Sequence, residues 1–198
     1  MSATNAPFGF VAAKHPSGNA RANAYTIASA YAANIFQGDP VKLVTAGTIQ
    51  LGTSDGTRTG TVDNISLLGV FAGCEYIDGT GKPVVSNYWP ASTVATNIVA
   101  YVYDDPNTQY VVQANGSIAA TAIGDQADWA EFNTNGGGST ATGRSTGALS
   151  STLVGAAANG QFRILEIQRG VDNAAGDAYT KVVVQIAEHS YRAEAAAV

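Results

Sequence analysis

The stretch LLGVFAGCEYI at residues 67–77 decides the fold class of this chain. It is an apolar run without a helical period, and it predicts one long strand. Gly69 and Gly73 stand inside it, at positions where a barrel strand bulges or bends. The turn-forming residues 78–81 lead into a second predicted strand at 83–89. We therefore read Gly79-Thr80-Gly81-Lys82 as a hairpin turn and not as a phosphate loop, because Pro83 replaces the Ser or Thr that would bind Mg²⁺.

Short strands separated by turn signals continue on both sides of this stretch. The further segments that predict strands are 25–29, 35–36, 41–44, 48–51, 98–103, 110–114, 162–167 and 181–186. Strands at intervals of about ten residues are typical of antiparallel barrels and sandwiches. We therefore expect a mainly β fold whose body is a β-barrel, a β-tulip or a sandwich, with an extended N-terminal arm and long loops.

The expected organisation is a single β domain at residues 25–189. Residues 1–24 read as an arm, because Pro and Gly interrupt any regular element there while Phe8, Phe10 and Val11 are too apolar for a solvated tail. The arm packs either on its own domain or on a neighbouring subunit, and our hypothesis is that it clasps a neighbour. A Gly-, Ser-, Thr- and Asn-rich insertion near 133–160 predicts exposed loops, and residues 190–198 predict a C-terminal tail.

Composition limits the functions that this chain can have. Of its 198 residues only 13% are charged, with a net charge of −5, which favours a surface committed to other subunits. Lys and Arg are scattered singly, so we expect no nucleic-acid partner. No apolar run approaches the roughly 20 residues of a membrane span, so we expect no membrane partner. The N-terminus has no secretory signal pattern, so we expect the chain to be synthesised in the cytoplasm of a bacterial host.

Residues that could carry chemistry do not form a coherent site in the sequence. Gly52-Thr53-Ser54-Asp55-Gly56 matches the nucleophile-elbow pattern, but a polar loop follows it and His189 is the one histidine downstream. His15, His189 and Cys74 are too few and too scattered for a zinc site. We therefore expect no enzyme, no metal site and no cofactor. Asp104-Asp105-Pro106-Asn107 is either a cation site or a turn, and its residue types favour the turn.

Several stretches together resemble the capsid decoration, or cement, proteins of tailed bacteriophages. They are NAPFGF at 5–10, YTIAS at 25–29, QGDPVKL at 37–43, LGVFAGCEY at 68–76, YWPAST at 88–93, STATGRS at 139–145 and EHSYR at 188–192. The resemblance covers most of the chain and implies a β-barrel or β-tulip body in symmetric oligomers. It also implies a position on the capsid exterior of the virion, across junctions between capsomers, with the major capsid protein as partner.

The expected interface is apolar and aromatic. Its members are Phe8, Phe10, Val11, Tyr88, Trp89, Tyr101 and Tyr103. Self-association through such a face favours closed symmetry, and we expect a homotrimer, with a dimer as second choice. Two alternatives stay open: another virion β-protein of the tail or head fibre, or a carbohydrate-binding module that stacks sugars on Tyr88, Trp89 and Trp129.

Overall fold

The structure, a computed structural model, describes residues 4–53, 66–130, 137–155 and 159–192. These residues form sixteen strands and one short 3-10 turn, η1 (Ala120–Ala122). All ladders between the strands are antiparallel, and they build two six-stranded sheets and two two-stranded ones. The prediction of a mainly β fold is confirmed.

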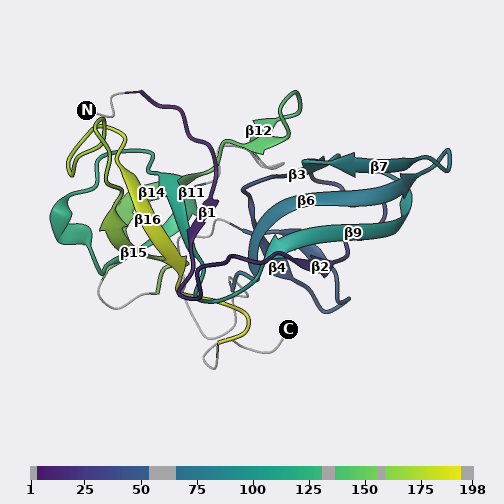
Figure 1. Cartoon of the computed structure of the whole chain (residues 1–198), viewed down its shortest axis with the longest axis horizontal. Coiled ribbons are helices and arrows are strands. Elements are labelled where there is room, and N and C mark those ends of the chain that lie inside the picture. Colours follow the sequence, from purple (N-terminus) through teal and green to yellow (C-terminus); the bar gives the residue numbers. More distant parts are fainter. Residues whose placement is uncertain (1–3, 54–65, 131–136, 156–158, 193–198) are drawn as a thin grey trace.

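The first six-stranded sheet is strongly curved. Its strands run in the order β1 (Val11–Lys14), β10 (Gln109–Gln113), β16 (Lys181–Ile186), β15 (Phe162–Ile167), β11 (Gln126–Ala130) and β14 (Ala148–Leu153). The sheet bends until Leu149 of β14 forms an isolated bridge with Ala114, directly after β10. We call it the curled sheet; it lies on the left in Figure 1.

The second six-stranded sheet extends away from the first. Its strands are β2 (Asn23–Tyr25), β9 (Ala95–Tyr103), β6 (Gly69–Asp78), β4 (Pro40–Leu43) and β5 (Ile49–Leu51), with β7 (Pro83–Ser86) paired to the far half of β6. Near the first sheet it also bends, so that Ile27 bridges Ile49. Beyond that point β6, β7 and β9 project outward, on the right in Figure 1. We call it the projecting sheet.

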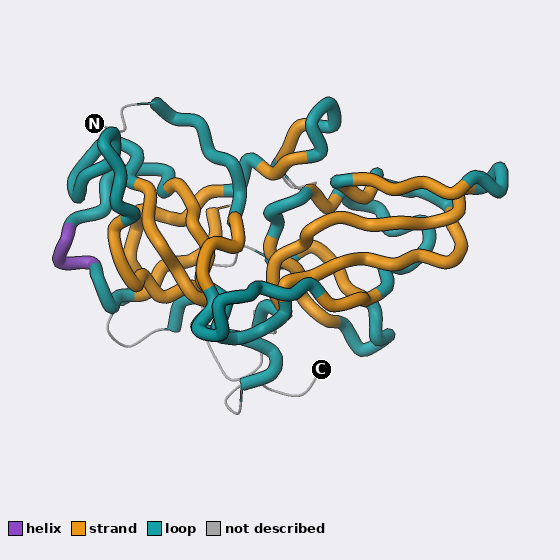
Figure 2. The backbone as a smooth tube through the Cα atoms, viewed as in Figure 1, coloured by secondary structure: helices purple, strands orange, loops and turns teal. Residues whose placement is uncertain are grey.

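Neither sheet is a closed barrel. Among the described residues, each sheet is joined across its open side by one isolated bridge and not by a continuous ladder. Figure 2 shows the strands in two groups with loop segments between them. The expected barrel is therefore present as curvature without closure.

Two small sheets fill the space beside β6. Strands β3 (Ile35–Phe36) and β8 (Tyr88–Trp89) pair with each other, and Trp89 meets Tyr76 of β6 edge-on at 5.2 Å between ring centroids. Strands β12 (Gly138–Ser139) and β13 (Arg144–Ser145) form a hairpin held to Gln37 by two backbone hydrogen bonds. Tight packing explains the hairpin's composition, because a Cβ on Gly138 would lie 2.4 Å from the Phe36 ring.

Near 133–160, where exposed loops were expected, residues 138–145 form the β12–β13 hairpin, and its turn at 140–142 is exposed, but the surrounding residues are largely buried. Gly137, Gly143, Ser145 and Gly147 are buried, and β14 follows directly. Gly and Ser occur there because the backbones approach closely and leave no room for larger side chains. The resulting composition is the same as that of an exposed loop, so the sequence does not distinguish the two. Residues 131–136 and 156–158 lie outside the described part of the chain.

The N-terminal segment belongs to the chain's own core. Phe10 is buried, and its ring stacks on Phe162 at 4.4 Å, while β1 pairs with β10. The backbone of residues 4–6 is held by the side-chain amide of Gln113. Phe10 was therefore wrongly expected to clasp a neighbour, because burying it in the chain's own core already yields the roughly 1.5–3 kcal/mol that docking was expected to provide. Val11 stays exposed and Phe8 is partly buried.

The two glycines of β6 have the roles expected for a bent strand. The β6–β9 register shifts between Phe71 and Gly73, and Gly73 has a φ of +142° that side chains disfavour. At Gly69 the strands approach so closely that a Cβ would lie 2.1 Å from the Tyr103 carbonyl oxygen. These two positions allow β6 to belong to the bent base and to the projecting part of the same sheet.

Candidate functional site

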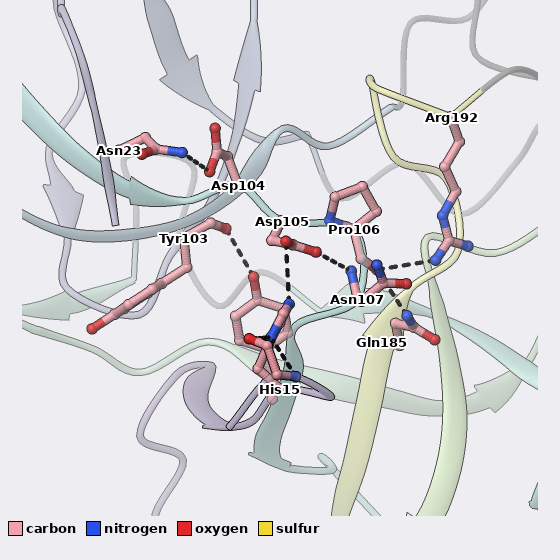
Figure 3. A network of polar contacts seen from close by, with 11 residues as sticks. His15, Asn23, Tyr103, Asp104, Asp105, Pro106, Asn107, Gln185 and Arg192 are labelled. Atoms are coloured by element: carbon pink, nitrogen blue, oxygen red, sulfur yellow. Dashed lines mark hydrogen bonds and ion pairs between the residues drawn. The ribbon is translucent and has the colours of Figure 1, made fainter. Parts of the chain in front are cut away.

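Polar side chains gather where the two large sheets meet. The connection between β9 and β10 is a turn in which Asp105 Oδ1 accepts the Asn107 amide at 2.8 Å and the Asp105 carbonyl accepts the Thr108 amide at 3.0 Å. Figure 3 shows this turn with side chains from the N-terminal and C-terminal segments around it. The interpretation of residues 104–107 as a turn is confirmed.

Asp104 is a buried carboxylate whose oxygens are both occupied. Oδ1 accepts a hydrogen bond from the Asn23 side-chain amide at 2.7 Å, and Oδ2 accepts one from the Tyr25 hydroxyl at 2.5 Å. The Tyr25 hydroxyl also lies 2.8 Å from the Tyr191 hydroxyl. Burial, followed by the hydrogen bond to Asp104, raises the pKa of Tyr25 far above its ordinary value. The phenol therefore stays protonated and ties β2 to the β9–β10 turn.

Asp105 faces a different partner. Its Oδ2 lies 3.2 Å from His15 Nε2, and the Asn107 amide, followed by His15, holds the pKa of Asp105 below its usual value. The two neighbouring aspartates thus point to separate groups (Figure 3) and do not converge. Across the described ranges, no group of three or more His, Cys, Asp or Glu residues is arranged to hold a metal ion.

An open cleft of about 490 Å³ adjoins this turn. It is lined by His15, Ser17, Asn19, Arg21, Asn23, Asp104, Asp105 and Pro106. Most of its charged groups already have partners within the fold: both carboxylates are bound as described above, and His15 Nδ1 lies 2.6 Å from the Ser17 hydroxyl. We interpret the cleft as the solvent-facing side of a structural junction.

The C-terminal segment closes the same junction. The Pro106 carbonyl accepts hydrogen bonds from Gln185 at 2.8 Å and from Arg192 at 3.0 Å. His189 is buried, its Nδ1 accepts the Tyr191 amide, and its backbone forms a bridge with Leu67. Burial, aided by the Arg192 charge, lowers the pKa of His189 to about 4, so the imidazole is neutral at pH 7. Residues 190–192 are therefore docked, whereas 193–198 lie outside the described residues.

The seven expected interface residues do not form one patch. Phe10 and Trp89 are buried in the core, and Tyr88 stacks on Phe36 at 5.3 Å. Phe8 and Tyr103 are partly buried, while Val11 and Tyr101 are exposed but belong to different sheets. Phe10 and Trp89 were assigned wrongly because an aromatic side chain in a short β segment looks the same in sequence whether it is in a core or on a surface.

The structure also contradicts the proposed stacking of sugars on Trp89 and Trp129. Trp89 and Trp129 are both fully buried, so neither indole presents a face to solvent. The Trp129 ring packs close to Gly147, where a Cβ would lie 2.7 Å from the indole nitrogen. Both tryptophans are core residues in this structure.

The projecting sheet has an exposed, weakly charged surface that the sequence did not single out. On its inner face, Cys74, Tyr76, Ala100 and Val102 are buried. On the opposite face Val85 of β7, Glu75 of β6 and Val99 of β9 are cross-strand neighbours in one row. Tyr101, two residues after Val99 in β9, is the next residue on the same face. Val85 is 83% exposed and Tyr101 36% exposed. We call this surface the outer face; it comprises Ala24, Glu75, Ile77, Val85, Val99 and Tyr101.

The motifs that suggested catalysis have structural explanations or cannot be placed. The Asp78 carboxylate accepts the backbone amides of Thr80 and Lys82, so the glycine-rich segment is a hairpin turn as predicted. Ser54 and Gly56 of the nucleophile-elbow pattern lie outside the described residues. Among the described residues, no helix has the length and apolar character needed to span a membrane.

Comparison with known proteins yields no relative: no protein family, no curated protein and no solved structure matches the chain.

Proposed function

We propose that this chain is a structural protein that binds to a larger assembly through the outer face of its projecting sheet. The observation that carries the proposal is this face itself, a four-strand surface of exposed and partly exposed residues, five of them uncharged and one a carboxylate. Large apolar side chains that cluster on one exposed surface are typical of interaction sites. The assembly that fits the sequence best is the capsid of a tailed bacteriophage, with this chain as a decoration protein on its exterior.

The architecture is suited to such a role for a physical reason. The inner face of the projecting sheet contributes to the same hydrophobic core as the curled sheet, so the opposite face can expose apolar groups without being needed to complete that core. A contact of about 1,500 Å² is typical of stable association. Many identical copies on a shell act together, so a modest affinity for each contact suffices to stabilise junctions between capsomers.

Purified virions from the strain that carries the gene provide the direct test. Mass spectrometry should find this chain in a copy number comparable with that of the major capsid protein, and deletion of the gene should lower the temperature at which heads release DNA. A chain absent from virions would refute the proposal. Density on the tail or on a head fibre, in a cryo-EM map, would instead assign it to another virion structure.

We also propose that the chain self-associates with closed symmetry, as a trimer at three-fold positions of the shell or, as second choice, as a dimer. The low charge of the chain supports self-association. Native mass spectrometry of the purified protein, together with the symmetry of its density on particles, distinguishes the two. Isolated monomer densities without mutual contact would contradict self-association.

A further inference from the structure

The outer face has one charged group, the Glu75 carboxylate, and this group restricts what can cover the face. Glu75 is the cross-strand partner of Val85 on one side and of Val99 on the other. The Tyr101 hydroxyl donates a hydrogen bond to Glu75 Oε1 at 2.9 Å, which holds the carboxylate next to the Tyr101 side chain. No other residue of the described part forms a hydrogen bond or an ion pair with this carboxylate.

Burial of this carboxylate in an interface requires a counter-charge. A charge removed from water without a partner costs more than the surrounding apolar contacts gain. The neighbouring residues of the outer face are uncharged, so none of them can neutralise Glu75. The cation must therefore come from the molecule that covers the face.

The same argument disfavours a second copy of this chain packed through the same face. In a two-fold contact the same surface patch meets itself, so two Glu75 carboxylates would approach each other without a cation between them. Like charges placed together at an interface lower the affinity by about a hundredfold or more. The charge of the face therefore complements a basic partner.

Resting on the proposed function, we propose that the outer face docks on a surface of the capsid shell protein that presents an arginine or lysine within an apolar rim. Glu75, held by Tyr101, receives this cation, while Val85, Val99 and Ile77 cover the rim. Arginine suits the site best, because a carboxylate with one oxygen already bound still offers acceptor sites to its planar, multiple donors.

The test uses the full-length protein and heads of the encoding phage assembled without it. Binding is measured by co-sedimentation over a range of protein concentrations and of sodium chloride concentrations. Glu75→Gln retains the shape and an acceptor for Tyr101, and we expect it to lower affinity about tenfold or more and to weaken the salt dependence. Val85→Asp should lower affinity to a similar extent, because it places a second acid in the rim.

Matched controls lie on the curled sheet and on an exposed loop. Glu166→Gln removes a carboxylate from β15, and Val171→Asp changes a fully exposed valine between β15 and β16. Both should bind within about twofold of the unmodified protein, because surface changes away from a contact have small effects. Thermal melting of each variant verifies that the fold is intact.

The outcomes separate this inference from the proposed function. If the unmodified protein binds heads and the two outer-face variants bind equally well, the inference is wrong and the proposed function stands. If the outer-face variants abolish self-association in sedimentation velocity and leave binding to heads unchanged, the face is a contact between copies and the inference is also wrong. If the unmodified protein does not bind heads, both fail.

Discussion

The curled sheet and the projecting sheet are built from similar strands but use them differently. In β16 of the curled sheet Val182, Val184 and Ile186 on one face and Val183 on the other are all buried, so both faces of the strand are covered at its centre. In the far half of β6, buried Cys74 and Tyr76 alternate with the partly exposed Glu75 and Ile77. Valine-rich strands thus form a core where both faces are covered, and an available surface where only one face is.

The largest effect that tests this contrast comes from truncating one aromatic core residue. Phe162→Ala should lower the free energy of unfolding by about 3–5 kcal/mol, because Phe162 is fully buried and stacks on Phe10. Val85→Ala on the projecting sheet should change it by less than about 0.5 kcal/mol. Urea denaturation measures both. Equal losses would show that the projecting sheet is as strongly packed as the curled one.

The second prediction concerns acid and the junction between the sheets. The folded pKa of His189 is about 4, below the ordinary value of 6.5, so the unfolded state binds a proton first as the pH falls. The stability contributed by the neutral imidazole is complete above about pH 6.5 and is lost between about pH 6.5 and pH 4, by about 3 kcal/mol.

The measurement is the unfolding free energy as a function of pH, with His189→Gln as the control. The variant should be less stable at pH 7 but should lose less stability across that window. The lowered pKa of Asp105 acts separately, because its contribution disappears only below the ordinary aspartate range. A pH profile that is the same for both proteins would contradict the assignment to His189.

The third prediction sharpens the comparison within β6 itself. Gly69→Ala should cost about 1–3 kcal/mol, because the added Cβ would meet the Tyr103 carbonyl and force β6 and β9 apart. Gly79→Ala, at the tip of the same hairpin, has its nearest contact at 3.9 Å and should be close to neutral. Melting temperatures of the two variants decide the point, and a neutral Gly69→Ala would mean that the strands separate easily.

The smallest effect is expected at the C-terminal end of the junction. Arg192→Ala removes the hydrogen bond to the Pro106 carbonyl and should cost about 1 kcal/mol. Hydrogen exchange should then become faster in residues 187–191 and stay unchanged in β15. Exchange that accelerates through the whole curled sheet would indicate that the junction supports that sheet and not only the segment beside it.

The strands were predictable from sequence to the extent that local pattern encodes them. The apolar run at 67–77 and the alternating run at 181–186 became β6 and β16 with nearly the predicted bounds. β14 was missed, since its sequence, ALSSTL, resembles the polar stretch before it. The junction was not predictable either, because Asn23 and Asp104 are 81 residues apart, and no local signal pairs them.

The outer face was only partly predictable. Alternation identifies which residues of β6 and β9 share a face, and Tyr101 was correctly expected to be exposed. Which face is covered depends on β3 and β8, whose packing on β6 is a tertiary event. Sequence patterns therefore locate faces, and only the assembled chain shows which of them is free.

The position of β16 in the curled sheet has a consequence for how the protein is made. This strand pairs with both β10 and β15, and in chain order it is the last of the strands in the described residues. Until residue 186 has emerged, β10 and β15 each lack the neighbour that they share. Pairing across such long sequence separations is slow. The curled sheet is therefore completed only after residue 186 has been synthesised, and a product truncated before residue 181 has two unsatisfied strand edges that are prone to aggregation.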